Sequence, residues 1–343
     1  MELAKYRCLN CQQSRWSVYS TLWRCESCGF CYRCTNGIPK LYLEETLAEK
    51  DRTLRDGFYD GFVGTYYRFV MPFLTLPARP LSLSWRDWIV FGVVAVALVA
   101  IVADLAFIAL LRPLSHLNVL DGLAVIAALS VAWFFKRHPY VFFLFILAVP
   151  VRISLALARF RPETSFADVH RQVIARLKSR TGGIRLLDVA TGNCASLYKH
   201  GWMELDAQYT GIDLSDTMIL QGLNHMSRKG VAVELALADA THLPFQADTF
   251  DVVTSYGAIN GMGDPGTALS EMVRVTKKGG VLFFLDEQLY PQASLVERLY
   301  FEKVLSGHNT VHKCPIDLLP DGLADVTVYQ VYQFYYICVA VKV

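Results

Sequence analysis

The chain has 343 residues, which is more than one ordinary domain, so we expect two or three organised units. Its 33 lysine and arginine residues are nearly balanced by 31 aspartate and glutamate residues, and the net charge of +2 disfavours RNA or DNA as the main partner. The hydrophobic fraction of 53% is high for a soluble protein, and the excess is concentrated in residues 88–157. Part of the chain is therefore expected to lie in lipid.

Six of the nine cysteines lie within the first 34 residues, as three pairs of the form Cys-x-x-Cys. The first two pairs are separated by 13 residues, a spacing typical of a four-thiolate zinc site. A disulfide framework is the alternative, but no secretory leader is apparent, and a reducing compartment favours a metal. The predicted zinc ligands are Cys8, Cys11, Cys25 and Cys28. Cys31 and Cys34 either exchange into the site or are spare.

The N-terminal segment, residues 1–43, is predicted to be a zinc ribbon. It has too little apolar sequence for a core of its own, so the metal is expected to stabilise its fold. Residues 44–86, here called the connecting segment, are predicted to form entry helices to the C-terminal domain, because this segment is rich in tyrosine and phenylalanine and its apolar spacing is compatible with helices.

Residues 87–160 are predicted to be a membrane segment. Residues 88–111 form an apolar run of 24 residues, long enough as a helix to cross a hydrocarbon core of about 30 Å. Residues 117–135 form a second run of 19, so the two make a transmembrane helical hairpin. Residues 140–158 begin with a shorter apolar run, which suits an interfacial or re-entrant helix.

Basic residues are concentrated at the base of this hairpin, whereas Arg112 alone marks its tip. This distribution predicts that the ribbon and the C-terminal domain lie on the cytoplasmic side of the membrane. Asp104 and Asp121 lie inside the two spans. They indicate an ion or substrate site, a structural pairing with Arg112, or carboxylates close enough to water to stay solvated.

Residues 161–343 form the last predicted unit, in which helical and strand patterns alternate. This alternation predicts an α/β domain with a parallel, doubly wound sheet. The predicted strands are residues 184–190, 209–213, 231–237, 250–255 and 280–286, followed by a closing pair at 324–331 and 333–341. Within it, a hydrophobic strand, a small-residue turn at residues 190–194 and a second strand that ends in Asp213 are the parts of a nucleotide-binding crevice.

Four sequence blocks in this domain share one family pattern. They are Leu187-Asp188-Val189-Ala190-Thr191-Gly192, Gly211-Ile212-Asp213-Leu214-Ser215, Ala238-Asp239-Ala240-Thr241 with Phe250-Asp251-Val252-Val253, and Arg274-Val275-Thr276-Lys277-Lys278-Gly279-Gly280. In this order, the blocks resemble class I S-adenosylmethionine-dependent methyltransferases, and most closely the branch that contains the ubiquinone/menaquinone-biosynthesis C-methyltransferases. The resemblance covers about residues 184–286, with weaker similarity in residues 58–71. It implies a Rossmann-like sheet.

The resemblance also implies roles for individual residues. Asp188 would reach the methionine ammonium, Asp213 the ribose hydroxyls and Asp239 the adenine amino group, since a carboxylate accepts from each of these donors. The implied cofactor-binding residues are Asp188, Ala190, Gly192, Asn193, Asp213, Leu214, Asp239, Ala240 and Tyr256. Tyr256, Asn260 and His308 are weak candidates for a catalytic base, because none has a recognisable catalytic spacing.

Cys194 departs from the family pattern, which has a glycine at this position. We expect its side chain to face the methionine end and weaken binding, or the turn to follow a different path. The ribbon resembles a small zinc-ribbon family found as partners or fused heads of methyltransferases, which implies either a docking module for a protein partner or a structural cap.

The resulting hypothesis is a membrane-anchored methyltransferase that uses S-adenosylmethionine and zinc and acts on a lipophilic small molecule or lipid. The alternative is a non-catalytic membrane scaffold that binds partners through the ribbon and the methyltransferase-like domain. Cys194 favours the scaffold, whereas Asp188, Asp213 and Asp239 favour the enzyme.

Overall fold

The computed structural model describes residues 3–61, 64, 163–179, 182–295, 298, 301–302, 313–332 and 334–343. All of them belong to one compact unit, Met1–Met71 with Phe160–Val343, and the other unit is Pro72–Arg159. The predicted membrane segments, with Asp104 and Asp121, lie outside the described residues. Among the residues that are described, no helix is both long enough and apolar enough to cross a membrane.

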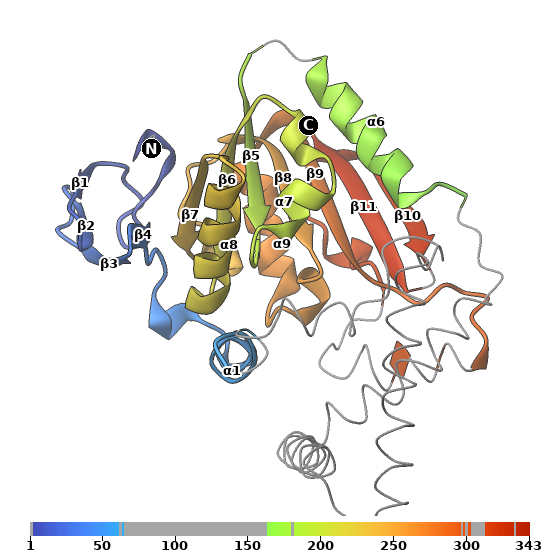
Figure 1. Ribbon diagram of the computed structural model, residues 1–343, viewed down its shortest axis with the longest axis horizontal. Coiled ribbons are helices and arrows are strands. Elements are labelled where there is room, and N and C mark those ends of the chain that lie inside the picture. The colour runs from blue at the N-terminus through green and yellow to red at the C-terminus, as the bar shows by residue number, and fades with distance from the viewer. Residues whose placement is uncertain are drawn as a thin grey trace, which may run out of the picture. The chain divides into compact units, whose positions relative to one another are not determined.

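A seven-stranded mixed sheet forms the centre of this unit (Figure 1). Its strands are β5 (Ile184–Val189), β6 (Ala207–Asp213), β7 (Val233–Leu237), β8 (Phe250–Tyr256), β9 (Thr276–Glu287), β10 (Leu323–Tyr332) and β11 (Tyr335–Lys342), in the order β10-β11-β9-β8-β5-β6-β7. The strands β5 to β9 are parallel, whereas β11 runs antiparallel to both β9 and β10. This arrangement confirms the predicted Rossmann-like α/β sheet with a closing pair of strands.

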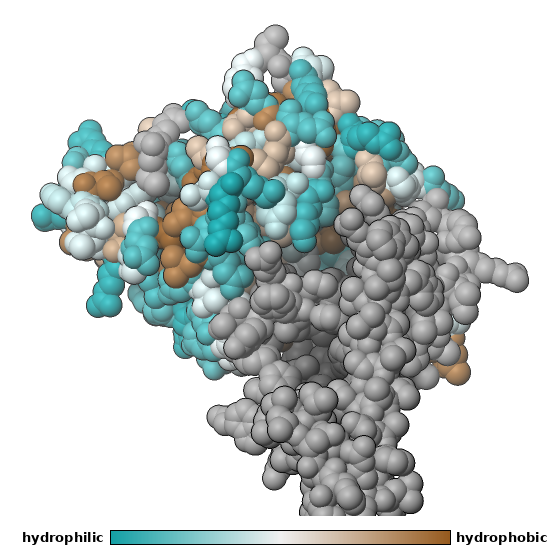
Figure 2. Space-filling model, viewed as in Figure 1, coloured by the Kyte–Doolittle hydropathy of each residue, from teal (hydrophilic) through white to brown (hydrophobic). Residues whose placement is uncertain are grey.

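Helices cover both faces of the sheet, because the central parallel strands bury side chains on either side. The helices are α6 (Phe166–Lys178), α7 (Ala195–Lys199), α8 (Asp216–Arg228) and α9 (Pro265–Val275), with short turns η5 (Trp202–Glu204), η6 (Ala240–His242), η7 (Ile259–Gly261) and η10 (Ile316–Leu318). Side chains of α6, α7 and α8 share one core cluster, and those of α9 belong to the other. In the coloured part of Figure 2, hydrophilic residues predominate, as expected where amphipathic helices turn their polar sides outward.

The N-terminal ribbon is a small antiparallel sheet. It contains β1 (Trp16–Val18), β2 (Leu22–Cys25), β3 (Cys31–Thr35) and β4 (Ile38–Pro39), preceded by the turn η1 (Leu3–Lys5). Its aromatic side chains do not form a separate core: Tyr6 and Trp23 lie in the same cluster as Phe245 of the large domain. The ribbon also continues the edge of the sheet, since the Leu41 N–H donates to the Leu237 carbonyl at 2.7 Å.

The connecting segment contains η2 (Glu44–Thr46), α1 (Glu49–Leu54) and the π-helical turn η3 (Arg55–Tyr59). It contacts two loops of the large domain. The Gly263 N–H donates to Asp51 at 2.9 Å, and a Cβ on Gly263 would lie 2.6 Å from that of Ala48, so glycine is needed for this close approach. Near its end, Asp60 accepts hydrogen bonds from the start of α8. The segment therefore lies against the loops that follow β6 and β8.

Candidate active site and metal centre

The candidate site lies at the carboxyl edge of the sheet. Strands β8, β5, β6 and β7 are neighbours and parallel, so the residues that follow them meet at one edge. The turn at residues 190–194 follows β5, Asp213 ends β6, and Asp239 lies just beyond β7. The backbone links these positions, because Ala238 donates its N–H to the Asp213 carbonyl at 3.0 Å.

The turn after β5 has a left-handed backbone at three positions. Ala190, Gly192 and Cys194 have φ values of 54°, 55° and 61°. Only glycine adopts this region freely, so the alanine and the cysteine each cost about 1 kcal/mol or more. The Thr191 N–H donates to the Ile212 carbonyl at 2.8 Å and helps to hold this conformation.

Cys194 does not face the edge of the sheet. The residue is fully buried, and its Sγ lies 2.8 Å from the position that a Cβ would take on Gly222 of α8. The thiol is therefore packed beneath α8, in contrast to the expectation that it faces the methionine end. Burial raises the pKa of this thiol to about 12, so it remains protonated at neutral pH.

Asp188 is a buried acid that accepts three hydrogen bonds from side-chain hydroxyls. Its carboxylate is 1% exposed and accepts from the hydroxyls of Thr191, Ser196 and Thr254, at 2.7, 2.6 and 2.7 Å. Burial raises the pKa of Asp188, and the three hydroxyls oppose this shift. These bonds join β5, its turn, α7 and β8, so Asp188 braces the site from within. The three hydroxyl residues were not predicted from the sequence.

Asp213 lies at the rim and is only partly buried. One carboxylate oxygen accepts the Gly192 N–H at 2.8 Å and the other accepts the Ser215 N–H at 2.9 Å. Each oxygen therefore retains a lone pair for a further donor. Burial raises the pKa of Asp213 to about 6, and the nearby Asp60 carboxylate adds to the shift. Leu214 follows directly and packs, partly buried, against the α8 side of the core.

Asp239 caps the turn η6, which begins with Ala240. It is 2% exposed and accepts from the backbone N–H and the hydroxyl of Thr241, at 2.9 and 2.6 Å.

Asn193, another predicted contact, is nearly buried, and its carbonyl lies 3.2 Å from Nδ1 of His225. The structure thus brings Asp213, Asp239 and the Gly192 turn to one edge of the sheet.

Tyr256 directs its hydroxyl into the layer that covers the sheet. The indole N–H of Trp202 donates to this hydroxyl, which in turn lies 2.8 Å from Nε2 of His170. The other ring nitrogen of His170 lies 2.8 Å from the Phe166 carbonyl and must donate to it, so Nε2 accepts the Tyr256 proton. The hydroxyl is therefore committed to α6 and η5 in this structure.

Asn260 is fully buried and takes part in a network of hydrogen bonds. Its side-chain N–H donates to the Glu287 carbonyl at 2.7 Å, and its backbone N–H donates to Asp286 at 2.8 Å. The Tyr336 hydroxyl donates to its amide oxygen at 3.3 Å. These bonds fix the loop after β8 to the end of β9. The third catalytic candidate, His308, lies outside the described residues.

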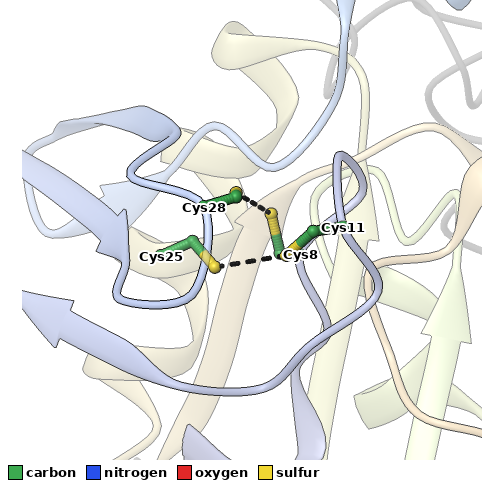
Figure 3. A group of neighbouring side chains, drawn as sticks. All are labelled: Cys8, Cys11, Cys25 and Cys28. Atoms are coloured by element: carbon green, nitrogen blue, oxygen red, sulfur yellow. Dashed lines mark hydrogen bonds between the residues drawn. The ribbon is translucent and has the colours of Figure 1, made fainter.

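The four predicted ligand cysteines converge in the ribbon (Figure 3). Their sulfur atoms all lie within 4.8 Å of one another, with Cys8 3.7 Å from Cys28 and Cys11 3.5 Å from Cys25. A tetrahedral zinc with Zn–S bonds of about 2.3 Å has sulfur-to-sulfur edges of about 3.8 Å, whereas a disulfide needs about 2.05 Å. The geometry thus fits four thiolates around one ion. Cys31 and Cys34 are not part of this group.

Comparison with known proteins agrees with this geometry. The family model described as "Methyltransferase domain" matches residues 187–284, the part of the chain that contains β5 to β9. A ubiquinone/menaquinone biosynthesis C-methyltransferase UbiE of Teredinibacter turnerae is 37% identical over 121 residues, which cover 34% of this chain and 48% of the relative. A phosphatidylethanolamine N-methyltransferase of Cereibacter sphaeroides is 30% identical over 145 residues, which cover 40% of this chain and 69% of the relative.

Among solved structures, a SAM-dependent methyltransferase from Aquifex aeolicus matches with 20% identity and a TM-score of 0.38, over 51% of this chain and 89% of that one. The fold and the acidic sheet edge define an α/β methyltransferase domain. The chain belongs to the S-adenosylmethionine-dependent methyltransferases. It spans about half the length of the UbiE relatives that it matches.

Proposed function

We propose that this chain is a membrane-anchored methyltransferase that transfers the methyl group of S-adenosylmethionine to a lipophilic small molecule or lipid. The observation that carries the proposal is the position of Asp213. Its carboxylate closes the Gly192 turn from the end of β6 and keeps lone pairs for further donors. A vicinal diol, such as that of a ribose, provides two such donors.

The residues at the edge fit the adenosyl cofactor. Asp213 would hold the ribose, Asp239 with Ala240 the adenine, and the turn from Ala190 to Asn193 the methionine part. The bound cofactor supplies an electrophilic methyl group on a sulfonium. The chain's own contribution is to position this group, because a neutral thioether leaves readily and orientation then accounts for most of the rate. Asp188 contributes by holding the turn rigid.

A lipophilic acceptor is supported by two independent observations. The relatives are named for quinone and phosphatidylethanolamine substrates, both of which partition into membranes. The apolar runs at residues 88–111 and 117–135 have the length of membrane spans. An anchored enzyme meets such an acceptor in two dimensions instead of three. We also propose that the ribbon and the methyltransferase domain lie on the cytoplasmic side of the membrane, because basic residues flank the base of the predicted hairpin.

We further propose that Cys8, Cys11, Cys25 and Cys28 bind one zinc ion. Sulfur distances close to tetrahedral edges support this assignment. The ribbon shares its aromatic core with the large domain and hydrogen-bonds to β7, which supports the role of a structural cap. Metal binding would then stabilise this side of the sheet.

Isotopic labelling tests the proposed function. The full chain in lipid vesicles, incubated with S-adenosylmethionine carrying a labelled methyl group and a membrane-lipid extract, is expected to transfer label to the lipid fraction. Mass spectrometry of lipids from cells with and without the chain should show a species heavier by one methylene group only in the first. Label that appears only in protein or RNA would overturn the proposed acceptor class.

A further inference from the structure

Asp60 of the connecting segment lies beside Asp213, although the two are far apart in the sequence. Ser215 joins them, because its hydroxyl donates to Asp60 and its backbone N–H donates to Asp213 at 2.9 Å. The Thr217 N–H donates to the same Asp60 oxygen at 3.1 Å. Asp60 is thus fixed against the first turn of α8, at the same edge of the sheet as Asp213.

Both carboxylates lack a counter-charge among the described residues. The ion pairs of this part of the chain include neither Asp60 nor Asp213. Oδ2 of Asp60 also has no hydrogen-bond partner there, since both donors use Oδ1. Two neighbouring anions with unused lone pairs repel each other, so a ligand that supplies hydroxyl donors or positive charge stabilises the arrangement.

We propose that Asp60 is a second ribose-binding acid, which completes the adenosyl site from the connecting segment. The inference rests on the proposed function and deepens it, because it adds a contact outside the four sequence blocks of the methyltransferase domain. Asp213 and Asp60 then offer acceptors to the two hydroxyls of one diol. The connecting segment thereby takes part in cofactor binding.

Calorimetry with S-adenosylmethionine and its demethylated product tests this role. Asp60→Asn keeps a side-chain oxygen that can accept from Ser215 and Thr217, but it removes the charge. Because a hydrogen bond to a charged group is stronger than one to a neutral group, we expect Asp60→Asn to weaken the binding of both ligands about tenfold. Asp56→Asn is the matched control, because Asp56 is exposed on the same turn and pairs only with Arg55 among the described residues.

Two results would overturn the inference. Unchanged ligand affinity in Asp60→Asn would show that the charge of Asp60 does not contact the ligand. If affinity falls in Asp60→Ala but not in Asp60→Asn, Asp60 only holds the first turn of α8. In either case, Asp213→Ala shows whether the proposed function fails as well. If that variant still loses binding, only the inference about Asp60 fails, whereas a wild-type chain that binds neither ligand would overturn the proposed function itself.

The pH dependence of binding provides a second readout. Among the described residues, the ionisable groups that interact with Asp213 include the Asp60 carboxylate and the neutral Cys194 thiol, and backbone N–H groups of Gly192, Leu214 and Ser215 oppose the rise of its pKa. Removing the charge of Asp60 should lower the pKa of Asp213. The pH below which affinity falls is therefore expected to be lower in Asp60→Asn than in the wild type. A purely structural role predicts the same pH midpoint in both.

Discussion

Asp188 and Asp213 both end strands at the same edge of the sheet, but their surroundings give them different tasks. The Asp188 carboxylate accepts hydrogen bonds from three internal hydroxyls. The Asp213 carboxylate accepts hydrogen bonds from two backbone N–H groups, and its remaining lone pairs can accept further donors at the rim. The first acid therefore stabilises the site and the second is placed to bind. Both residues are predicted from the sequence as cofactor contacts, and only their partners in the structure distinguish the two environments.

Asp188→Ala should lower the free energy of unfolding by about 2–4 kcal/mol, because three buried hydroxyls lose their acceptor. Urea denaturation measures this loss. Thr254→Val is the matched control, since it removes only one of the three donors and should cost about 1 kcal/mol. Equal losses in the two variants would contradict the bracing role of Asp188.

The side-chain directions of Tyr256 and Cys194 could not be predicted from the sequence. Both residues belong to segments that the family pattern places at the cofactor, but the direction of each side chain depends on distant partners. Tyr256 bonds with His170 and Trp202, and Cys194 packs against Gly222. Such directions follow from tertiary packing, which a strand or turn pattern does not contain.

At the scale of elements, the ribbon and the sheet form one core. Lys5 shows how closely they are joined: it is 5% exposed, donates to Thr210 of β6 at 2.8 Å and pairs with Glu234 of β7 at 2.8 Å. A buried ammonium requires such partners, since an unpaired charge in the interior is very costly. The ribbon therefore covers part of the sheet that would otherwise be exposed to solvent.

Metal removal should therefore weaken the whole domain. We expect about one zinc ion per chain by elemental analysis, and Cys28→Ser should lower both the zinc content and the melting temperature. Cys31→Ser is the control, because Cys31 is equally exposed but lies outside the cluster. Equal metal content in the two variants would contradict the assignment of the ligands.

Two histidines in the layer formed by α6 and α7 should make the stability of the fold sensitive to acid. Burial lowers the pKa of His170 to about 4 and that of His200 to about 3, from an ordinary value of 6.5. Both are neutral in the folded chain but take up a proton when unfolded below pH 6.5. The stability that they contribute is therefore complete above this pH and is lost as the pH falls toward about 4.

His200→Phe tests this sensitivity. His200 stacks on Tyr256 with ring centroids 5.3 Å apart, and phenylalanine preserves this packing without a titrating group. Urea denaturation between pH 6.5 and 4.5 should show a stability loss that is smaller in the variant by about 1.4 kcal/mol per pH unit. Parallel pH profiles for variant and wild type would contradict the prediction.

Most elements of the large domain were predictable because their patterns are local. The central strands are apolar runs bounded by turn residues, and the observed strands overlap all seven predicted ones. The contacts of the ribbon and the connecting segment were not predictable. They join residues such as Leu41 with Leu237, or Asp60 with Ser215, and no local periodicity specifies these partners.

At the scale of the whole molecule, the chain divides into two compact units, Met1–Met71 with Phe160–Val343 and Pro72–Arg159. The proposed anchor lies in the second unit. Deleting residues 88–135 should therefore release the protein from lipid vesicles but leave zinc content and cofactor affinity within about twofold of the wild type. Flotation with vesicles measures the release, and a deletion variant that still floats would contradict the hairpin.

The central claim is that Asp213 holds the adenosyl ligand at the carboxyl edge of the sheet, and calorimetry of Asp213→Ala tests it most directly. Asp206→Ala is the matched control, because Asp206 is exposed just before the opposite end of the same strand. We predict that Asp213→Ala weakens S-adenosylmethionine binding by at least about tenfold with unchanged circular dichroism, and that Asp206→Ala binds like the wild type. Equal affinities in the two variants would contradict the account.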